Sequence, residues 1–339
     1  MAEYLDKLRA DFNGILDVRH NPEFVVARRS VDDTRVSLVS GCGGGHEPLC
    51  SGFVGEGMLD AACPGGTFGS PTTAQIVEAS KAVASKEGVM HIVPHFKRDA
   101  EAFQTAADTL REAGIRVRDV IIDDDIALRD PRHTEGRRAL GTVIAAARIC
   151  GAAARSGYRL NRLAQLCKQV NVNGKSLAAT LFGADAFHDT RTEVEIGIGL
   201  NGEPGIERRQ VRDCAELTAL LTERIISDGP FMRYVTEWDV ENWRWHEVEV
   251  HDTSFRSGDR VIGIVSSLGE TPVCDLDGVC QQVTETAAAR GVTLERVIFG
   301  HFMSAKNPAG VAITLVKVDD EMLKFWDAPV RTAALETTG

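Results

Sequence analysis

The sequence predicts an α/β protein of two domains, each a β-sheet flanked by helices. Three observations support this. The chain has 339 residues, more than one hydrophobic core usually serves, so two domains of about 150–200 residues are expected. Short apolar runs alternate with amphipathic segments, which is typical of strands that alternate with helices. Apolar residues make up 43% of the chain and charged residues 26%, as in ordinary globular proteins.

The first domain is expected to span residues 1–182. An apolar run at 36–39 predicts a buried strand that enters a glycine-rich turn. The helix expected at 73 begins with Ser-Pro-Thr-Thr, a helix-entry signal. Helices are predicted at 73–86, 99–113, 134–156 and 160–170, and strands at 88–93, 115–122 and 175–182. This alternation indicates a largely parallel sheet.

A polar segment at 183–192 is predicted to be the hinge into a second domain at 193–339. That domain is expected to open with a strand of alternating pattern, followed by a glycine-rich turn. Further helices are predicted at 212–227 and 276–290, and further strands at 261–267, 296–300 and 311–316.

Charge and composition narrow the classes of partner. The net charge is −11, from 38 basic and 49 acidic residues, which argues against a nucleic-acid or anionic-membrane partner. No apolar run approaches the roughly 18 residues that a membrane span needs. The N-terminus lacks the pattern of a signal peptide, and the eight cysteines include no Cys-x-x-Cys pair. We therefore expect a cytoplasmic protein with reduced thiols.

The glycine-rich turn is the first candidate for chemistry. Four of the five residues from Gly41 to Gly45 are glycine, and His46 follows. Such a loop can adopt positive φ and can present backbone N–H groups to a small polar ligand. The histidine adds a group that titrates near neutral pH. The spacing fits no phosphate-binding fingerprint. A tight turn under a packed strand remains the alternative interpretation.

A resemblance favours the functional interpretation. The run GGGHEPLCSGFVGEGMLDAACPGGTFGSPT, at residues 43–72, resembles the substrate-binding subunit of dihydroxyacetone kinases. That family carries Gly-His-Glu-Pro, Gly-Met-Leu, Ala-Cys-Pro-Gly and Ser-Pro-Thr in this order. Similar landmarks at 202–209, 257–261 and 326–329 extend the resemblance to essentially the whole chain.

The resemblance implies the family's two-domain fold and a homodimer. It also implies that this chain binds no cofactor itself, because a separate partner would supply the phosphoryl donor, ATP or a phosphoprotein. Within the site, His46 would hydrogen-bond near a short ketose, and Gly43, Gly44 and Ser70 would contact the sugar. Asp99 would be the base that takes a proton from the hydroxyl to be phosphorylated. A helix N-cap is the alternative role for Asp99.

Two departures from the family pattern bear on function. The family's covalent histidine is replaced by Asn201. An amide nitrogen, whose lone pair is delocalised, cannot attack a carbonyl carbon, so Asn201 is expected to contribute hydrogen bonds only. Lys97 and Arg98 stand where the family has Thr-Gly, with His95 close by.

One hypothesis is that Lys97 and Arg98, with His95, face the ligand and select an anionic substrate. The other is that they form a solvated basic turn. Beside two cations, Asp99 is expected to stay ionised and to be a weaker base.

Metal binding is not expected. The soft ligands near the glycine loop, Cys42, His46, Cys50 and Cys63, match no common zinc spacing. The run Asp123–Asp125 could bind a divalent ion, but turn and capping roles are favoured there.

The leading hypothesis is a kinase substrate subunit that holds a short keto or hydroxy sugar, or a sugar acid, without a covalent bond. Two alternatives stay open. One is a non-kinase enzyme, such as an isomerase, that uses Asp99, His46 and His95 as acid and base groups. The other is a non-catalytic ligand sensor or regulatory binder.

Overall fold

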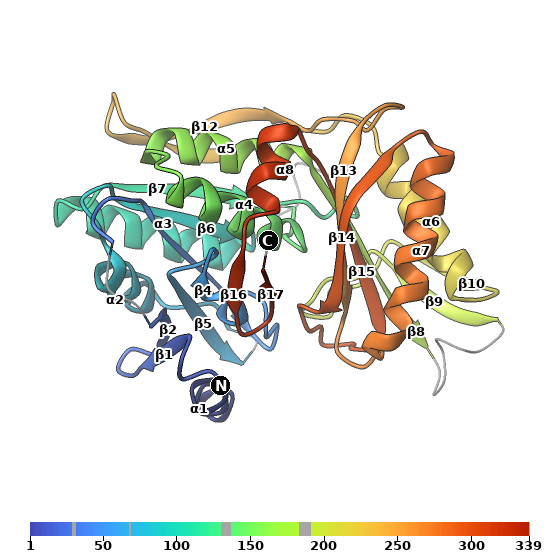
Figure 1. The fold of residues 1–339 in the computed structure, drawn as a ribbon, viewed down its shortest axis with the longest axis horizontal. Helices are drawn as coiled ribbons and strands as arrows, with labels where there is room; N and C mark the ends of the chain where they lie inside the picture. Colours follow the sequence, from blue (N-terminus) through green and yellow to red (C-terminus); the bar gives the residue numbers. More distant parts are fainter. Residues whose placement is uncertain (29–31, 68, 130–136, 183–190, 339) are drawn as a thin grey trace.

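Two six-stranded sheets, with helices between and outside them, make up the fold. The computed structural model describes residues 1–28, 32–67, 69–129, 137–182 and 191–338 (Figure 1). The two-sheet α/β architecture predicted from the sequence is confirmed.

The first sheet belongs to the N-terminal half. Its strand order is β1 (Leu16–Arg19), β2 (Phe24–Ala27), β5 (Ala61–Thr67), β3 (Ser37–Gly44), β6 (Val89–Pro94) and β7 (Val117–Ile122). The last four are parallel, whereas β1 and β2 add an antiparallel edge. Because side chains alternate along a strand, Met90 and Ile92 enter one core and Val89 and Val93 enter another.

Helices cover both faces of this sheet. The cluster on one face includes α2 (Thr73–Val83) and α3 (Lys97–Glu112), and the cluster on the other includes α4 (Thr142–Arg155) and α5 (Leu160–Asn173). A further helix, α1 (Ala2–Asp11), packs beside β1. The entry signal at α2 is a capping box: Thr72 Oγ1 accepts from the Gln75 N–H at 3.2 Å, and the Gln75 side chain accepts from the Thr72 N–H at 2.8 Å.

The second sheet is mostly antiparallel. Its strand order is β10 (Glu207–Val211), β9 (Thr192–Ile196), β8 (Gly174–Phe182), β15 (Gly310–Lys317), β13 (Arg260–Ser267) and β14 (Thr293–His301). Only the β13–β14 pair is parallel among these described strands. The helices α6 (Cys214–Ser227) and α7 (Leu276–Ala289) lie on the side away from the first sheet (Figure 1).

The strand expected to close the first domain lies in the second sheet instead. β8 pairs with β15 and β9, so the expectation for 175–182 is wrong. The order of strands along the chain does not determine which strands are neighbours in a sheet. The apolar pattern of β8 shows that it is buried but does not identify the strands with which it forms hydrogen bonds. Of the predicted hinge at 183–192, residues 183–190 lie outside the described part of the chain.

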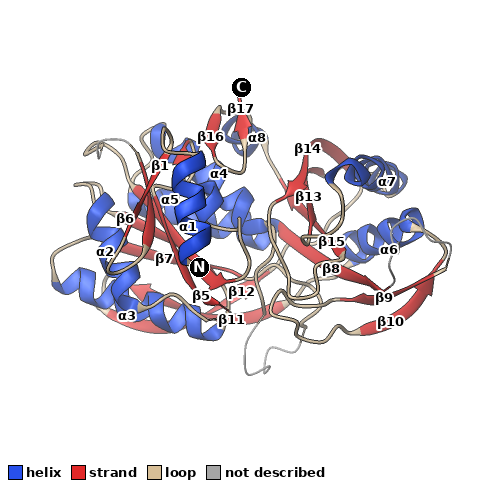
Figure 2. Ribbon diagram, turned by 90° about the horizontal axis from the view of Figure 1, so that it is seen from below, coloured by secondary structure: helices blue, strands red, loops and turns tan. Residues whose placement is uncertain are grey.

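The helix α4 joins the two sheets through one core. Every residue from Thr142 to Ala154 is buried, and the same hydrophobic cluster holds β6 residues and the inner face of the second sheet, including Ile262, Ile264 and Ala312. In the view of Figure 2, α4 and α5 lie over the first sheet on the side toward the second. The two halves therefore share a core through this helix.

The remaining elements cross between the halves. The C-terminal segment returns to the N-terminal half: α8 (Asp320–Trp326) packs on α4, and β16 (Val330–Thr332) pairs with β4 (Gly55–Glu56) and β17 (Glu336–Thr337). A hairpin, β11 (Met232–Asp239) and β12 (Arg244–His251), reaches from the second half to β7. Two short 3-10 helices, Ser51–Phe53 and Val273–Asp275, complete the elements described.

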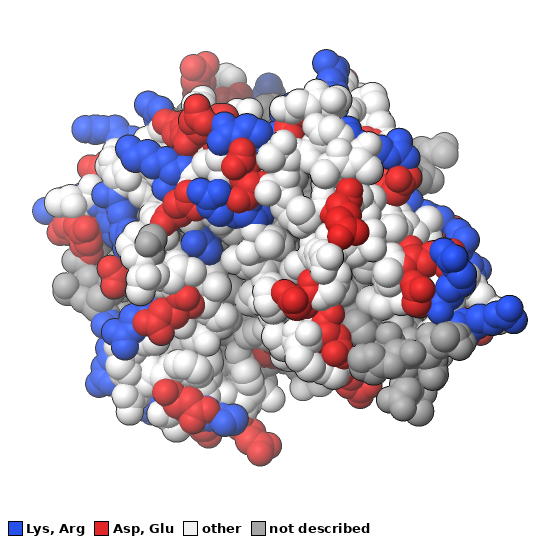
Figure 3. Space-filling model, turned by 45° about the vertical axis from the view of Figure 1, so that its right-hand side comes forward, with Lys and Arg blue, Asp and Glu red and all other residues white. Residues whose placement is uncertain are grey.

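The surface carries both signs of charge. On the face drawn in Figure 3, acidic and basic side chains lie interspersed around uncharged surface. Within the described ranges, no helix is both long and apolar enough to cross a bilayer.

The close approach of α4 to the N-terminal half predicts a sensitive glycine. A Cβ added at Gly151 would lie 2.2 Å from the Gly57 carbonyl oxygen, so the backbone would have to shift. We expect Gly151→Ala to lower the free energy of unfolding by about 1–3 kcal/mol, measured by urea denaturation.

The matched control is Gly278→Ala in α7, where nothing lies within 4 Å of the added Cβ. That change should stabilise the helix by roughly 0.5–1 kcal/mol. Equal effects at the two positions would contradict the packing described for α4.

Candidate active site

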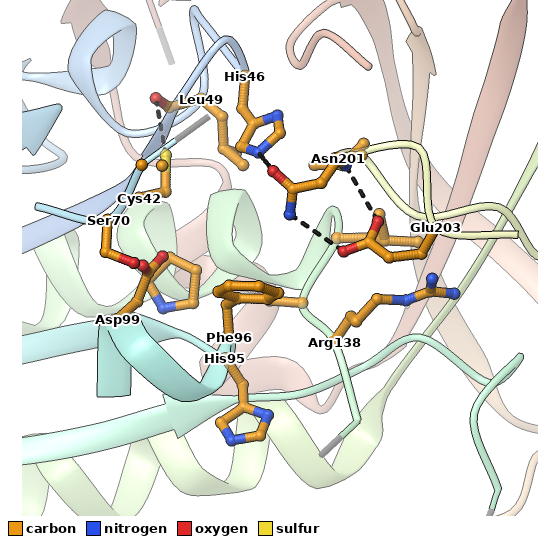
Figure 4. A pocket seen from close by; sticks show the side chains of 16 residues that line it. Cys42, His46, Leu49, Ser70, His95, Phe96, Asp99, Arg138, Asn201 and Glu203 are labelled. Atoms are coloured by element: carbon orange, nitrogen blue, oxygen red, sulfur yellow. Dashed lines mark hydrogen bonds between the residues drawn. The ribbon is translucent and has the colours of Figure 1, made fainter. Parts of the chain in front are cut away.

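Six of the nine predicted site residues line one pocket between the two halves of the chain (Figure 4): Gly43, His46, Ser70, His95, Asp99 and Asn201. Its empty volume is about 550 Å³. The N-terminal half contributes the loop after β3 and the segment that begins α3, and the second half contributes the loop after β9. The first contribution fits the rule that parallel α/β sheets bind ligands beyond the carboxyl ends of their strands.

His46 reaches across to the second half. Its Nε2 lies 3.0 Å from Asn201 Oδ1, and its Nδ1 lies 3.2 Å from the Ser304 carbonyl oxygen. The Ser304 carbonyl oxygen and Asn201 Oδ1 are both acceptors, so the ring nitrogen that carries a proton donates to its partner. Ser304 holds the same loop a second time, because its N–H donates to the His46 carbonyl at 3.2 Å.

Asn201 is held by Glu203, a residue that the sequence reasoning missed. The Asn201 side-chain amide donates to Glu203 Oε1 at 3.1 Å, and its backbone N–H donates to Glu203 Oε2 at 3.1 Å. These bonds leave the Asn201 carbonyl oxygen turned toward His46 (Figure 4). The signal in the sequence was the Gly-Glu-Pro-Gly landmark that contains Glu203.

Asp99 is buried in the first turn of α3 and lines the pocket. The N-cap of α3 is Phe96, so the capping role considered for Asp99 is wrong. Burial raises the pKa of the Asp99 carboxyl to about 6, against the lowering effect of hydrogen bonds from the Ser70 side chain and the Gly43 backbone. The expectation of a weaker base is therefore also wrong. Within the described residues, Asp99 Oδ1 has no hydrogen-bond partner.

Of the glycines assigned to the ligand, Gly43 lines the pocket and Gly44 does not. A Cβ at Gly44 would lie 2.5 Å from the Gly65 carbonyl oxygen, so this glycine allows β3 and β5 to approach closely. The glycine run continues β3 through Gly44 instead of turning at once.

The cations expected to face the ligand do not line this pocket. Lys97 and Arg98 are both exposed, and neither is among its lining residues; the expectation that they face it is wrong. The His95 ring points away from His46 in Figure 4, and its Nδ1 lies 2.6 Å from the Arg137 carbonyl oxygen. Among the described residues, the one arginine on the pocket wall is Arg138, another residue missed from the sequence.

Arg138 is committed to structural contacts. Its guanidinium lies 2.6 Å from Asp125 Oδ2 and donates to the Gly197 carbonyl oxygen at 2.9 Å. Asp124 accepts from the N–H groups of Leu140 and Thr142 at 2.7 and 2.9 Å. The aspartate run thus serves the turn and capping role favoured from the sequence. In the described ranges, no three His, Cys, Asp or Glu side chains are grouped to hold a metal ion.

Comparison with known proteins identifies the family. Residues 8–334 match the model of the Dak1 domain. The chain belongs to the Dak1 family. It is 36% identical to the PEP-dependent dihydroxyacetone kinase, dihydroxyacetone-binding subunit DhaK, of Escherichia coli, over 94% of this chain and 92% of the relative. It is 31% identical to the human triokinase/FMN cyclase, covering 91% of this chain but 52% of that protein.

Solved structures agree on the fold. A structure described under the regulation of the dha operon of Lactococcus lactis superposes with a TM-score of 0.82 at 25% identity, covering 98% of this chain and 95% of that one. The dihydroxyacetone kinase of C. freundii superposes with a TM-score of 0.80 at 22% identity, covering 99% of this chain and 58% of that one. The Dak1 chain described here thus shares the fold of these structures over nearly its full length.

The burial of Asp99 predicts a pH-dependent stability. Its pKa is raised in the folded chain, so the folded state binds this proton more tightly than the unfolded state. That stabilisation is complete below about pH 4 and is lost as the pH rises through about 6. Asp99→Asn removes the ionisation. Between pH 5 and pH 7.5, the free energy of unfolding of the variant should therefore rise by about 1 kcal/mol relative to that of wild type. Urea unfolding at the two pH values measures this change.

The quantity to compare is the change with pH in the stability difference between variant and wild type. The difference at a single pH is less informative, because the substituted amide also alters local hydrogen bonds by an amount that does not depend on pH. A difference between variant and wild type that stays constant over this range would contradict a buried, titrating carboxyl.

Proposed function

We propose that this Dak1 chain is the substrate-binding subunit of a kinase for a short, neutral polyhydroxy carbonyl compound, which it holds without a covalent bond. A partner supplies the phosphoryl donor, ATP or a phosphoprotein, because the sequence contains neither a Walker-type loop nor the protein-kinase motif set. The chain itself positions the substrate and accepts a proton.

The observation that carries the proposal is the free oxygen of Asp99. The carboxyl is buried beside the pocket, with one oxygen lacking any donor among the described residues. A buried acceptor without a donor costs free energy, and a substrate hydroxyl would supply the missing donor. A carboxyl with a pKa of about 6 is ionised at neutral pH and can take that proton as the phosphoryl group arrives.

Asn201 supports the non-covalent mode. By the resemblance of this chain to the family, Asn201 occupies the position of the covalent histidine. Its side-chain amide is hydrogen-bonded to His46 and Glu203. Neither amide atom is a nucleophile toward a carbonyl. His46, for its part, has Nε2 and Nδ1 directed at acceptors, which suits a hydrogen-bond donor to a substrate oxygen better than an attacking nitrogen.

The charges around the pocket favour a neutral substrate over a sugar acid. Asp99 and Glu203 contribute two carboxylates, and Arg138 is already paired with Asp125. Lys97 and Arg98 are exposed away from the lining. A carboxylate or phosphate on the ligand would meet acidic neighbours without an uncommitted arginine among the described lining residues to bind it.

A second candidate function rests on the same pair of groups. Asp99, with its raised pKa, and His46, whose imidazole can donate a proton, both line the pocket (Figure 4). A base and an acid so placed can also move a proton next to a carbonyl group, as an isomerase does. The two functions differ in their need for a phosphoryl donor.

Reconstitution distinguishes them. The chain is incubated with dihydroxyacetone or erythrulose and ATP, with and without a nucleotide-binding donor subunit of a dihydroxyacetone kinase. We expect phosphorylated product only with the donor subunit present, and we expect Asp99→Asn to lower the rate by about 10²–10⁴-fold. Product analysis by mass spectrometry and NMR detects phosphorylation and isomerisation separately.

Two controls accompany this experiment. Arg98→Gly should leave the rate unchanged, because Arg98 does not line the pocket. The matching sugar acids should be poor substrates. Ketose isomerisation by the chain alone would favour the second candidate, and efficient turnover of a sugar acid that depends on Arg98 would refute the neutral substrate.

The non-covalent mode has its own test. Native mass spectrometry of the wild-type chain with dihydroxyacetone should show a complex that dissociates fully on denaturation, because Asn201 supplies no nucleophile. Asn201→His restores an imidazole at this position and is the informative comparison. A denaturation-resistant adduct on the wild-type chain would contradict the proposal.

A further inference from the structure

Two cysteines lie side by side next to the glycine-rich loop. All eight cysteines of the chain are free thiols, and the thiols of Cys42 and Cys50 are in hydrogen-bond contact. Cys42 belongs to β3 and lines the active-site pocket. Cys50 is 1% exposed. The pair therefore combines a thiol on the pocket wall with a thiol that is buried behind it.

The backbone at Cys50 is strained. Its φ is +63° and its ψ is −69°, and across it the Ser51 N–H donates to the Leu49 carbonyl oxygen at 2.9 Å. This is a γ-turn of the rare, strained kind. The turn holds the Cys50 thiol against Cys42 and 3.4 Å from Ser40 Oγ. Strained residues are common at functional and switch sites, so the placement of this thiol suggests a role beyond packing.

Both thiols adjoin groups that support the active site. Cys42 precedes Gly43, whose N–H donates to the Asp99 carboxyl. Cys50 follows Leu49, whose N–H donates to the His46 carbonyl oxygen at 3.1 Å. The two segments also touch directly, because Cys42 Sγ donates to the Leu49 carbonyl oxygen at 3.7 Å (Figure 4). A change at either sulfur would therefore reach the side chains that line the pocket.

A second thiol pair provides an internal comparison. Cys150 in α4 and Cys167 in α5 are also in hydrogen-bond contact, and both are fully buried. They lie in the core between the two sheets, and neither lines the active-site pocket. The two pairs thus share a contact between thiols and differ in access from the pocket.

We propose that Cys42 and Cys50 form a reversible disulfide that disables the active site when a peroxide is present as oxidant. The Cys42 sulfur attacks one peroxide oxygen, the O–O bond breaks, and a sulfenic acid and water form. The Cys50 sulfur then attacks the Cys42 sulfur, the S–O bond breaks, and a second water leaves. Both thiol protons leave in the water, and the peroxide gains the two electrons that the sulfurs lose. A dithiol reductant reverses the reaction by thiol–disulfide exchange.

The disulfide changes the loop that carries His46. It closes residues 42–50 into a ring and removes the thiol proton that is donated to the Leu49 carbonyl oxygen. We expect the ring to draw the His46 imidazole away from Asn201, 3.0 Å from it in the reduced chain, and so to weaken substrate binding. That last step rests on the proposed function, whereas formation of the disulfide does not.

The oxidation is expected to be slow. The hydrogen bond with Cys50 and burial raise the pKa of the Cys42 thiol, and the thiolate is the reactive form. Millimolar rather than micromolar hydrogen peroxide should therefore be needed.

Peptide mass spectrometry tests for the disulfide. The background is Cys274→Ser, because Cys274 is exposed and could link two chains. After peroxide treatment, the unfolded chain is alkylated with iodoacetamide and digested with trypsin. Residues 36–81 form one tryptic peptide with three cysteines, Cys42, Cys50 and Cys63. This peptide should lose two hydrogen atoms and two alkylation sites, at least about tenfold faster than the Cys150 and Cys167 peptides become linked.

Substitutions identify the sulfurs. Cys42→Ser and Cys50→Ser should each abolish the disulfide, and Cys50→Ala serves if a buried hydroxyl at this position impairs folding. The matched control is Cys63→Ser in β5, which is also fully buried and should leave disulfide formation unchanged.

The His46 imidazole reports the effect on the site without a substrate. Its NMR ring-proton signals, identified by their absence from His46→Gln, should shift on oxidation and return with dithiothreitol. In Cys42→Ser, the same treatment should leave them in place. Dihydroxyacetone should bind the reduced chain and not the oxidised one. Failure to bind the reduced chain would count against the proposed function alone.

A 36–81 peptide that keeps all three alkylation sites after millimolar peroxide would overturn the proposal. Linkage of Cys150 to Cys167 at the same rate would also overturn it, because access from the pocket would then have no effect. A disulfide that forms and leaves the His46 signals unmoved would refute the effect on the active site.

Discussion

The burial of α4 on all sides is the constraint on which the rest of the structure depends. A helix that faces solvent has one apolar stripe, whereas Thr142 to Ala154 are all buried. Small side chains dominate this stretch, so β6 on one side and β8 and β15 on the other can both approach it. Because one helix serves both sheets, the two halves of the chain have a fixed relation. That relation lets His46 of one half meet Asn201 of the other.

Buried charges reinforce this junction. Asp124, just beyond β7, accepts hydrogen bonds from the start of α4 and from Ser176 in β8. Asp123 and Asp252 surround Arg233 of the hairpin. Each carboxylate has a partner from a different segment, and removing one partner of such a pair leaves an uncompensated buried charge. The polar run that could have been a cation site instead fixes where α4 begins and where the second sheet attaches.

Hydrophobic periodicity predicted a largely parallel first sheet, because buried strands that alternate with helices specify that class of sheet. Most of the pocket residues were predicted from the resemblance to the dihydroxyacetone kinase subunit. Neither predicted the direction of side chains in the first turn of α3. Successive residues of a helix are about 100° apart, so Asp99 turns inward while Lys97 and Arg98 face solvent. The sequence also did not predict that β8 belongs to the second sheet, because a buried apolar strand has the same sequence pattern in either sheet. Glu203 could have been found, but its contact with Asn201 depends on a turn whose geometry no pattern specified.

Asn201 also has a kinetic consequence. A carbon–nitrogen bond to the substrate would keep it in the pocket until that bond broke. In the proposed non-covalent mode, the lifetime of the complex would depend only on hydrogen bonds and burial, which set the dissociation rate. Occupancy of the pocket then follows the free concentration of substrate closely, rising and falling with it. If the proposed function holds, a donor partner would find this chain loaded in proportion to the current supply of substrate, rather than to what was bound earlier.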